Sequence, residues 1–121
     1  MKRDLELIRN ILFKIENSAG YPLSLSDFSS DPQQYPIISF HIELLLDAKF
    51  IVAHKIQFLR KSYPDFRIQR LTNDGCDYLD SIRDNEIWDK TKEKMKLVGG
   101  AMSFEVVKDL AISIAKLYLG I

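Results

Sequence analysis

Leu71-Thr72-Asn73-Asp74-Gly75, followed by Tyr78-Leu79, marks the point where a β-hairpin ends and a helix begins. The Thr72 hydroxyl can cap that helix, and Asp74 adds a negative charge to its first turn, where the helix dipole favours one. Gly75 is expected to let the helix approach a neighbouring segment closely, because it has no side chain. The stretch therefore predicts a chain that combines a hairpin with helices.

The segments before this junction supply the hairpin and two helices. Phe50-Ile51-Val52 and Phe66–Leu71 are rich in β-branched and aromatic residues, which predicts two strands joined around Pro64-Asp65. Apolar residues at three- and four-residue steps predict helices at residues 4–18 and 36–48. The order helix, strand, strand, helix is that of a winged-helix domain.

The predicted fold class is α+β, a winged helix-turn-helix-like domain with a helical C-terminal extension. Residues 1–84 are expected to form the winged-helix-like domain, and residues 85–121 to pack on it as the extension, so that the chain is a single structural unit. Between the first two helices, Ser, Asp and Pro are frequent from Pro22 to Gln34. This composition predicts a loop, with a short strand at Leu23-Ser24-Leu25.

The composition excludes several classes of function. With 121 residues and 46% hydrophobic content, the chain is long enough to bury one core. Its 17 basic and 17 acidic side chains cancel, so any attraction to nucleic acid or to a membrane must be local. No apolar run is long enough for a membrane span, and the charged start Met1–Glu6 is unlike a signal peptide. Cys76 is alone, so no intrachain disulfide forms, and we expect a reducing cytoplasm.

The helix at residues 36–48 occupies the position of the recognition helix of a winged-helix domain. Side chains that read the major groove are mainly Arg, Lys, Asn and Gln, and none lies between Ile37 and Ala48. Two carboxylates would approach the DNA phosphates instead. This composition argues against ordinary helix-in-groove binding. The face that we expect to point outward carries Ser39, Phe40, Glu43, Leu46 and Asp47.

The predicted hairpin, in contrast to this helix, has a composition that favours binding to nucleic acid. Between residues 55 and 70, five positive charges minus the one negative charge of Asp65 give a local charge of +4. Interleaved aromatic residues (Phe58, Tyr63 and Phe66) suit stacking on unpaired bases while the cations follow a phosphate backbone. Alternatively, the cations deter aggregation at a sheet edge while the aromatics pack inward. The candidate nucleic-acid-binding residues are Lys55, Arg60, Lys61, Arg67 and Arg70.

The segment after the hairpin predicts two helices and not one. Its apolar stripe changes phase between Ile82 and Ile87, which predicts a kink or break around Asp84-Asn85. Aspartates come early in this segment and lysines late, as the helix dipole favours. We interpret the aspartates as dipole partners and not as a metal site, because one helical face does not make their oxygens converge.

The last predicted helix, from about Ser103 to Leu119, is apolar almost all round. Such a helix must be covered on more than one side, by its own domain and by a second subunit. Burial of the whole helix within the monomer is the alternative, and we expect no membrane attachment. The candidate dimer-interface residues are Val106, Leu110, Leu117 and Ile121.

The sequence contains no recognisable catalytic or cofactor motif. His41, His54 and Cys76 lack the spacing of metal ligands, and we interpret His41 as a structural residue on the apolar side of its helix. Walker loops, dinucleotide fingerprints and nucleophile elbows are absent from the sequence. We therefore expect no catalytic residue, no metal and no cofactor, and a protein that is not an enzyme.

A set of short motifs spans almost the whole chain. They are Met1-Lys2-Arg3-Asp4 with Leu7-Ile8-Arg9, Phe40-His41 with Leu44-Leu45, Leu71-Thr72 with Gly75, Tyr78-Leu79-Asp80, Arg83-Asp84 with Trp88, and Gly99-Gly100 with Phe104-Glu105-Val106. Together they resemble a family of small uncharacterised bacterial and phage proteins, catalogued as a domain of unknown function and often carried by prophages. The resemblance implies a winged-helix-like fold and no active site. Where this chain has Asn73 and Cys76, relatives tend to have Trp and His, which argues against a catalytic or metal role there.

Two functions agree with these observations. The first is a DNA-associated regulator that binds weakly, and without strong sequence preference, through the basic hairpin. The second is a protein-interaction module that uses the acidic and apolar face of the second helix and the apolar last helix, without nucleic acid. The fold class by itself does not choose between them.

Overall fold

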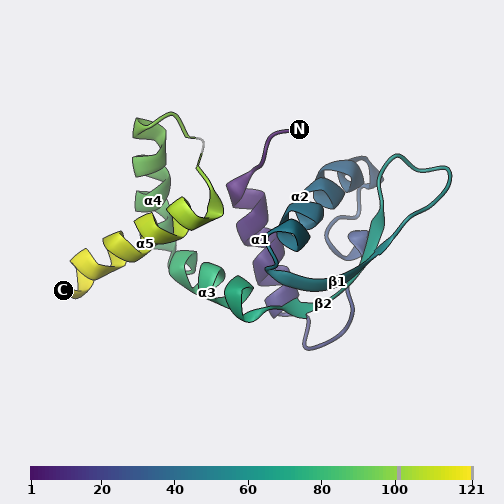
Figure 1. The fold of residues 1–121 in the computed structure, drawn as a ribbon, viewed down its shortest axis with the longest axis horizontal. Helices are drawn as coiled ribbons and strands as arrows, with labels where there is room; N and C mark the ends of the chain where they lie inside the picture. Colours follow the sequence, from purple (N-terminus) through teal and green to yellow (C-terminus); the bar gives the residue numbers. More distant parts are fainter. Residues whose placement is uncertain (101, 121) are drawn as a thin grey trace. The chain divides into compact units, whose positions relative to one another are not determined.

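The computed structural model describes residues 1–100 and 102–120, and the chain divides into two compact units. The first unit is Met1–Cys76 and the second is Asp77–Ile121. The fold is α+β, because five α-helices accompany one antiparallel two-stranded hairpin (Figure 1). No helix among the described residues is long and apolar enough to cross a membrane.

The first unit begins with helix α1 and ends at the start of helix α3. Its hairpin loop, between β1 and β2, projects beyond α2 (Figure 1). The elements in chain order are α1 (Leu5–Glu16), the short 3-10 helices η1 (Leu25–Asp27) and η2 (Pro32–Gln34), α2 (Tyr35–Asp47), β1 (Ile51–Ile56), β2 (Asp65–Leu71) and α3 (Asn73–Ile82).

Helix α1 forms where the spacing of apolar residues predicts it. The Asp4 carboxylate accepts hydrogen bonds from the backbone N–H groups of Glu6 and Leu7 and so caps the helix. The buried face consists of Ile8, Ile11, Leu12 and Ile15 together with Arg9.

His41 ties the N-terminal segment to α2 from a buried position. Its Nε2 accepts a hydrogen bond from the Asp4 backbone N–H at 2.8 Å, and its Nδ1 lies 2.7 Å from the Ile37 carbonyl oxygen. Because Nε2 acts as the acceptor, the ring proton must lie on Nδ1, which donates to Ile37. Both ring nitrogens are therefore used within the fold, as the structural interpretation of His41 predicts.

The hairpin is longer than the sequence predicts at its first strand. We expected Phe50–Val52, whereas β1 runs from Ile51 to Ile56. The strand is longer because its residues pair with β2 along the whole ladder, which ends where Ile56 pairs with Asp65. Leu23 adds a single antiparallel bridge on β2: its N–H donates to the Ile68 oxygen at 2.9 Å, and the Ile68 N–H donates back at 2.8 Å. The prediction of a short strand at residues 23–25 was therefore wrong in its extent, because only Leu23 bridges and Leu25 already begins η1.

The junction between β2 and α3 confirms the prediction made from residues 71–75. The Thr72 hydroxyl accepts a hydrogen bond from the Gly75 backbone N–H at 3.0 Å and so caps α3. Any side chain at Gly75 would overlap the backbone carbonyl of Phe50. Glycine is therefore required here by close approach and not by an unusual backbone angle.

The second unit contains the remainder of α3 followed by α4 (Asn85–Leu97) and α5 (Phe104–Leu119). The predicted break is confirmed, because α3 ends at Ile82 and the Asp84 carboxylate caps α4 by accepting from the Ile87 N–H at 3.0 Å. Gly99 and Gly100 both adopt positive φ after α4, and the Ser103 hydroxyl caps α5. The buried side chains of this unit include Tyr78, Leu79, Ile82, Trp88, Met95, Val107, Ala111 and Ile114.

Candidate functional site on the hairpin

The stem of the hairpin is held by buried or half-buried hydrogen bonds on two sides. The Ser39 hydroxyl of α2 donates to the Pro64 carbonyl at 2.7 Å, and this contact is buried. The Asp65 carboxylate accepts from the Leu25 N–H of η1 at 3.0 Å. Our assignment of Ser39 to the outward face of its helix was therefore wrong, because the hydroxyl is needed to satisfy Pro64.

A β-bulge determines which way the arginines of β2 point. Phe66 and Ile68 are buried, so strict alternation would also turn Arg70 inward and Leu71 outward. The register instead shifts by one residue: Val52 pairs with Arg70 and Ala53 pairs with Ile68, which leaves Gln69 as the extra residue. As a result Leu71 is buried and Arg70 is exposed.

The outer face of the hairpin therefore carries two exposed arginines. Arg67 is exposed, and its cross-strand partner is the exposed His54. The Arg70 guanidinium donates to the Leu71 backbone oxygen at 3.0 Å, which orients the side chain along the strand. We define this surface, His54, Arg67 and Arg70, as the outer hairpin face.

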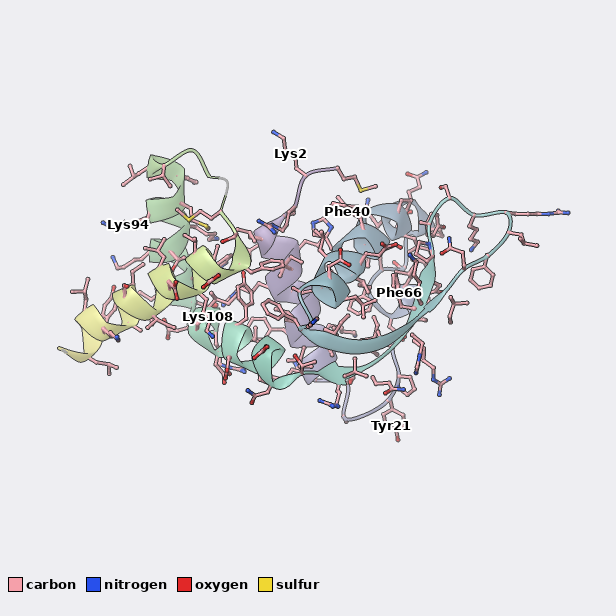
Figure 2. All side chains as sticks on the ribbon, in the orientation of Figure 1. Lys2, Tyr21, Phe40, Phe66, Lys94 and Lys108 are labelled. Atoms are coloured by element: carbon pink, nitrogen blue, oxygen red, sulfur yellow. The ribbon has the colours of Figure 1, made fainter. Side chains whose placement is uncertain are left out.

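The end of the hairpin is a turn with two further cations. The Lys61 N–H donates to the Phe58 carbonyl at 3.3 Å, which places Leu59 and Arg60 at the corners of the turn. The Lys61 ammonium lies 5.7 Å from the centre of the Phe58 ring and 5.8 Å from that of Tyr63. Side chains of this loop point into solvent, away from the labelled Phe40 and Phe66 (Figure 2). We define residues 58–61 as the tip turn.

Lys55 does not belong to the same surface as the other candidate cations. It pairs with Phe66, which is buried on the inner side of the hairpin, and its ammonium lies 3.3 Å from the Glu43 carboxylate of α2. Both side chains of this ion pair are partly exposed, so its contribution to stability is small. The remaining candidates, Arg60, Lys61, Arg67 and Arg70, lie on the tip turn or the outer hairpin face.

The aromatic residues of the hairpin also differ in how far they are exposed to solvent. Phe66 is buried and its ring belongs to the core, as the alternative in which the aromatics pack inward predicts, so it is not available for stacking. Tyr63 is half-buried. Phe58, with 46% of its surface exposed, is the most exposed aromatic side chain of the hairpin.

The electrostatic field around the tip turn is positive because acidic residues are missing from the sequence around it. No Asp or Glu occurs from residue 48 to residue 64. Asp65, which follows, accepts hydrogen bonds from the backbone N–H groups of Leu25 and Phe66. This end of the first unit therefore presents cations and apolar side chains, without a carboxylate from residue 48 to residue 64.

Helix α2 presents a different surface. Phe40, Glu43 and Leu44 are half-buried and Asp47 is exposed. The observed surface therefore combines apolar area with negative charge, in agreement with the composition of the helix. It offers no donor side chain for a base edge.

A second apolar surface lies in the second unit, between α4 and α5. A hollow of about 420 Å³ is lined by Lys90, Glu93, Lys94, Ile114, Leu117 and Tyr118. The Tyr118 hydroxyl donates to the Glu86 carboxylate at 3.1 Å, and a side-chain hydrogen bond with Tyr118 raises the pKa of Lys90 above its ordinary value. Of the candidate dimer residues, Leu117 is 80% and Val106 47% exposed, Leu110 is half-buried, and Ile121 lies outside the described residues.

Sequence reasoning missed two features of the hairpin. Leu59 was not singled out, although the run Phe58-Leu59-Arg60-Lys61 places two large apolar residues beside two cations where a turn usually has Gly, Asn or Asp. The bulge was also missed. Its signal was the change from even-numbered apolar positions (Phe66 and Ile68) to the odd-numbered Leu71.

Comparison with known proteins places the chain in a family. The model of the family described as "Hypothetical protein (DUF2513)" matches residues 2–101. The chain belongs to this family. An uncharacterized protein of Haemophilus influenzae (strain Rd) is 31% identical to this DUF2513 chain over 114 residues, which cover 94% of the chain and 95% of the relative. The resemblance noted in the sequence is thereby confirmed, and no solved structure matches the chain.

Proposed function

We propose that the first unit of this DUF2513 protein is a winged-helix-like domain. The order α1, bridging residue Leu23, α2, β1 and β2 supports this assignment, because winged helices place a short strand between their first helices and pair it with the wing. In this comparison η1 and η2 stand where the helix before the recognition helix would be. The hairpin is then the wing.

We propose that the protein is a binding module, not an enzyme, and that it associates with DNA weakly and without strong sequence preference. The observation that carries this proposal is the outer hairpin face, where the bulge brings Arg67 and Arg70 to the same exposed side. Cations in such a row contact phosphates, which fix a protein on the duplex without reading bases. The acidic surface of α2 supports the same mode, because it disfavours insertion of that helix into the major groove.

The test is the salt dependence of binding to a short duplex, followed by fluorescence anisotropy. Arg67→Ala with Arg70→Ala should weaken binding and reduce the slope of log K against log salt concentration by about two, one unit for each lost phosphate contact. Arg67→Lys with Arg70→Lys should retain most of the affinity and most of the salt slope, because contact with a phosphate depends on charge more than on geometry.

A control removes two exposed cations elsewhere. Lys94→Ala with Lys96→Ala takes the same charge from α4 and should leave the slope unchanged. Equal losses in both double variants would show that net charge alone governs binding. Tight, sequence-specific binding that survives the arginine changes would refute the proposal.

A second candidate function is association with protein through α5, and a second copy of the chain is the partner that we propose. The observation that favours it is the exposed apolar side chains of α5: Leu117 at 80%, Leu119 at 73% and Val106 at 47%. Side chains of this kind favour association because their burial removes apolar surface from water. This association needs no nucleic acid and is compatible with two hairpins on one assembly.

A further inference from the structure

The tip turn exposes apolar surface that the fold does not use. Leu59 is fully exposed, at 107% of its reference area, and Phe58 is exposed to 46%. Corner positions of turns are usually occupied by Gly, Pro, Asn, Asp or Ser, which need no apolar neighbour. Nothing within the hairpin covers Leu59, so this side chain is available to a partner.

The tip turn is presented on a well-held support. The stem is fixed by the contacts of Ser39 with Pro64 and of Asp65 with Leu25. Within the turn, the backbone hydrogen bond from Lys61 to Phe58 and the position of the Lys61 ammonium near the Phe58 ring hold the local geometry. Leu59 therefore projects from a defined structure, which reduces the entropy that is lost when it inserts into a partner.

The charges around Leu59 indicate the chemistry of that partner. Arg60 and Lys61 lie beside it, and no carboxylate occurs from residue 48 to residue 64. Further cations, Arg67 and Arg70, follow along the strand. Because of the bulge they lie opposite residues two steps apart on β1, His54 and Val52, which corresponds to about 7 Å at the usual rise of a strand. Arg60 and Lys61 at the tip suit any anionic surface, whereas the additional cations along the strand suit an extended phosphate backbone.

We propose that Leu59 is a wedge that inserts between adjacent base pairs of duplex DNA, with Arg60 and Lys61 on the flanking phosphates. Small apolar wedges flanked by cations are used in this way by proteins that bend DNA from the minor groove. The inference rests on the proposed function and adds a preference to it. Duplexes that unstack easily, at a mismatch or a pyrimidine–purine step, should bind more tightly than stiff ones.

The test uses the full chain and two duplexes that differ only in one central base of one strand. One duplex is fully paired, and the other has a central mismatch. Each carries 2-aminopurine beside the central step, so that fluorescence reports unstacking while anisotropy reports affinity. The unmodified protein should bind the mismatched duplex about tenfold more tightly and raise the 2-aminopurine signal. Leu59→Ala should abolish the preference and the signal change, yet bind the paired duplex within about twofold of the unmodified protein.

Two control variants test whether the effect requires an apolar side chain at position 59. Leu59→Met keeps the apolar bulk and should retain the preference. Leu97→Ala shortens another exposed leucine, at the end of α4, and should change neither readout. The intrinsic fluorescence of the buried Trp88 and circular dichroism verify that each variant is folded.

The outcomes separate the wedge from the proposed function. If Leu59→Ala keeps the mismatch preference and the signal change, the wedge is refuted, while loss of binding in the Arg67 and Arg70 variant still supports DNA association. If the unmodified chain binds neither duplex, both proposals fail. Binding to vesicles of anionic phospholipid that depends on Leu59, without any duplex response, would also overturn the wedge and assign the tip turn to a membrane surface.

Discussion

Thr72 joins three segments of the first unit through one side chain and one backbone group. Its hydroxyl caps α3 at the Gly75 N–H and donates to the Lys49 carbonyl at 2.7 Å, while its backbone N–H donates to Phe50 at 2.9 Å. Lys49 has a left-handed backbone with φ of 62°, so the end of α2 makes a sharp turn there. The hydroxyl of Thr72 therefore satisfies both this turn and the start of α3.

Replacement of Thr72 should reveal this double role. Thr72→Ala should lower the free energy of unfolding by about 1 to 2 kcal/mol, because α3 loses its cap and the Lys49 carbonyl loses a donor. Thr72→Ser keeps the hydroxyl and should recover most of that loss. Urea unfolding followed by circular dichroism measures the difference, and an alanine variant as stable as the unmodified chain would contradict the assignment.

The hairpin shows how one extra residue changes the surface of an element. If Gln69 paired regularly with β1 instead of forming a bulge, β2 would bury Arg70 and expose Leu71, since side chains alternate along a strand. The bulge shifts the phase so that Leu71 joins the core and both arginines face outward. Packing and the candidate interface therefore depend on the same local irregularity.

Deletion of Gln69 tests this account. The shortened strand alternates strictly, with Ile68 inward, Arg70 outward and Leu71 inward, so urea stability and duplex affinity should stay close to those of the unmodified chain. Deletion of Gln69 together with Arg70 instead places Leu71 directly after Ile68 and turns it outward. Unfolding should then become easier by roughly 1.5 to 3 kcal/mol, the value of burying one such side chain, and duplex affinity should fall. A single deletion that loses stability and affinity would contradict this account.

The whole molecule combines a first unit whose hairpin carries the positive charge with a second unit whose last helix carries exposed apolar surface. The net charge of the chain is zero, so the two kinds of surface are not evident from composition. Association of two copies through α5 would join two hairpins in one assembly. Paired binding elements on one assembly raise the effective affinity of weak contacts.

Self-association can be measured by sedimentation at micromolar concentration. The unmodified chain should sediment as a dimer, whereas Val106→Glu with Leu117→Glu should give a folded monomer, because burial of each apolar side chain contributes roughly 1.5 to 3 kcal/mol. Leu59→Glu places one such charge on a still more exposed leucine of the hairpin and should remain dimeric. A folded monomer for the unmodified chain would refute the dimer.

Local features of this chain follow from its sequence. Helix periodicity, the start of the last helix at Ser103, the break before Asn85 and the capping of α3 by Thr72 were predicted, and the structure confirms them. These features depend on side chains within four residues of one another, where spacing and hydrogen-bond chemistry are almost fixed. The requirement for Gly75 was predicted too, although its neighbour, Phe50, was not.

Features that depend on distant partners had to come from the tertiary structure. The pairing of β2 with β1 produces the bulge. The hydrogen bond of Ser39 with Pro64 and the ion pair of Lys55 with Glu43 join α2 to the hairpin, and the sequence did not predict either contact. Phe66 and Leu59 have similar hydrophobicity, yet one is buried and the other fully exposed. Burial depends on which segments, far apart along the chain, pack over a side chain, and the local pattern of residues does not contain that information.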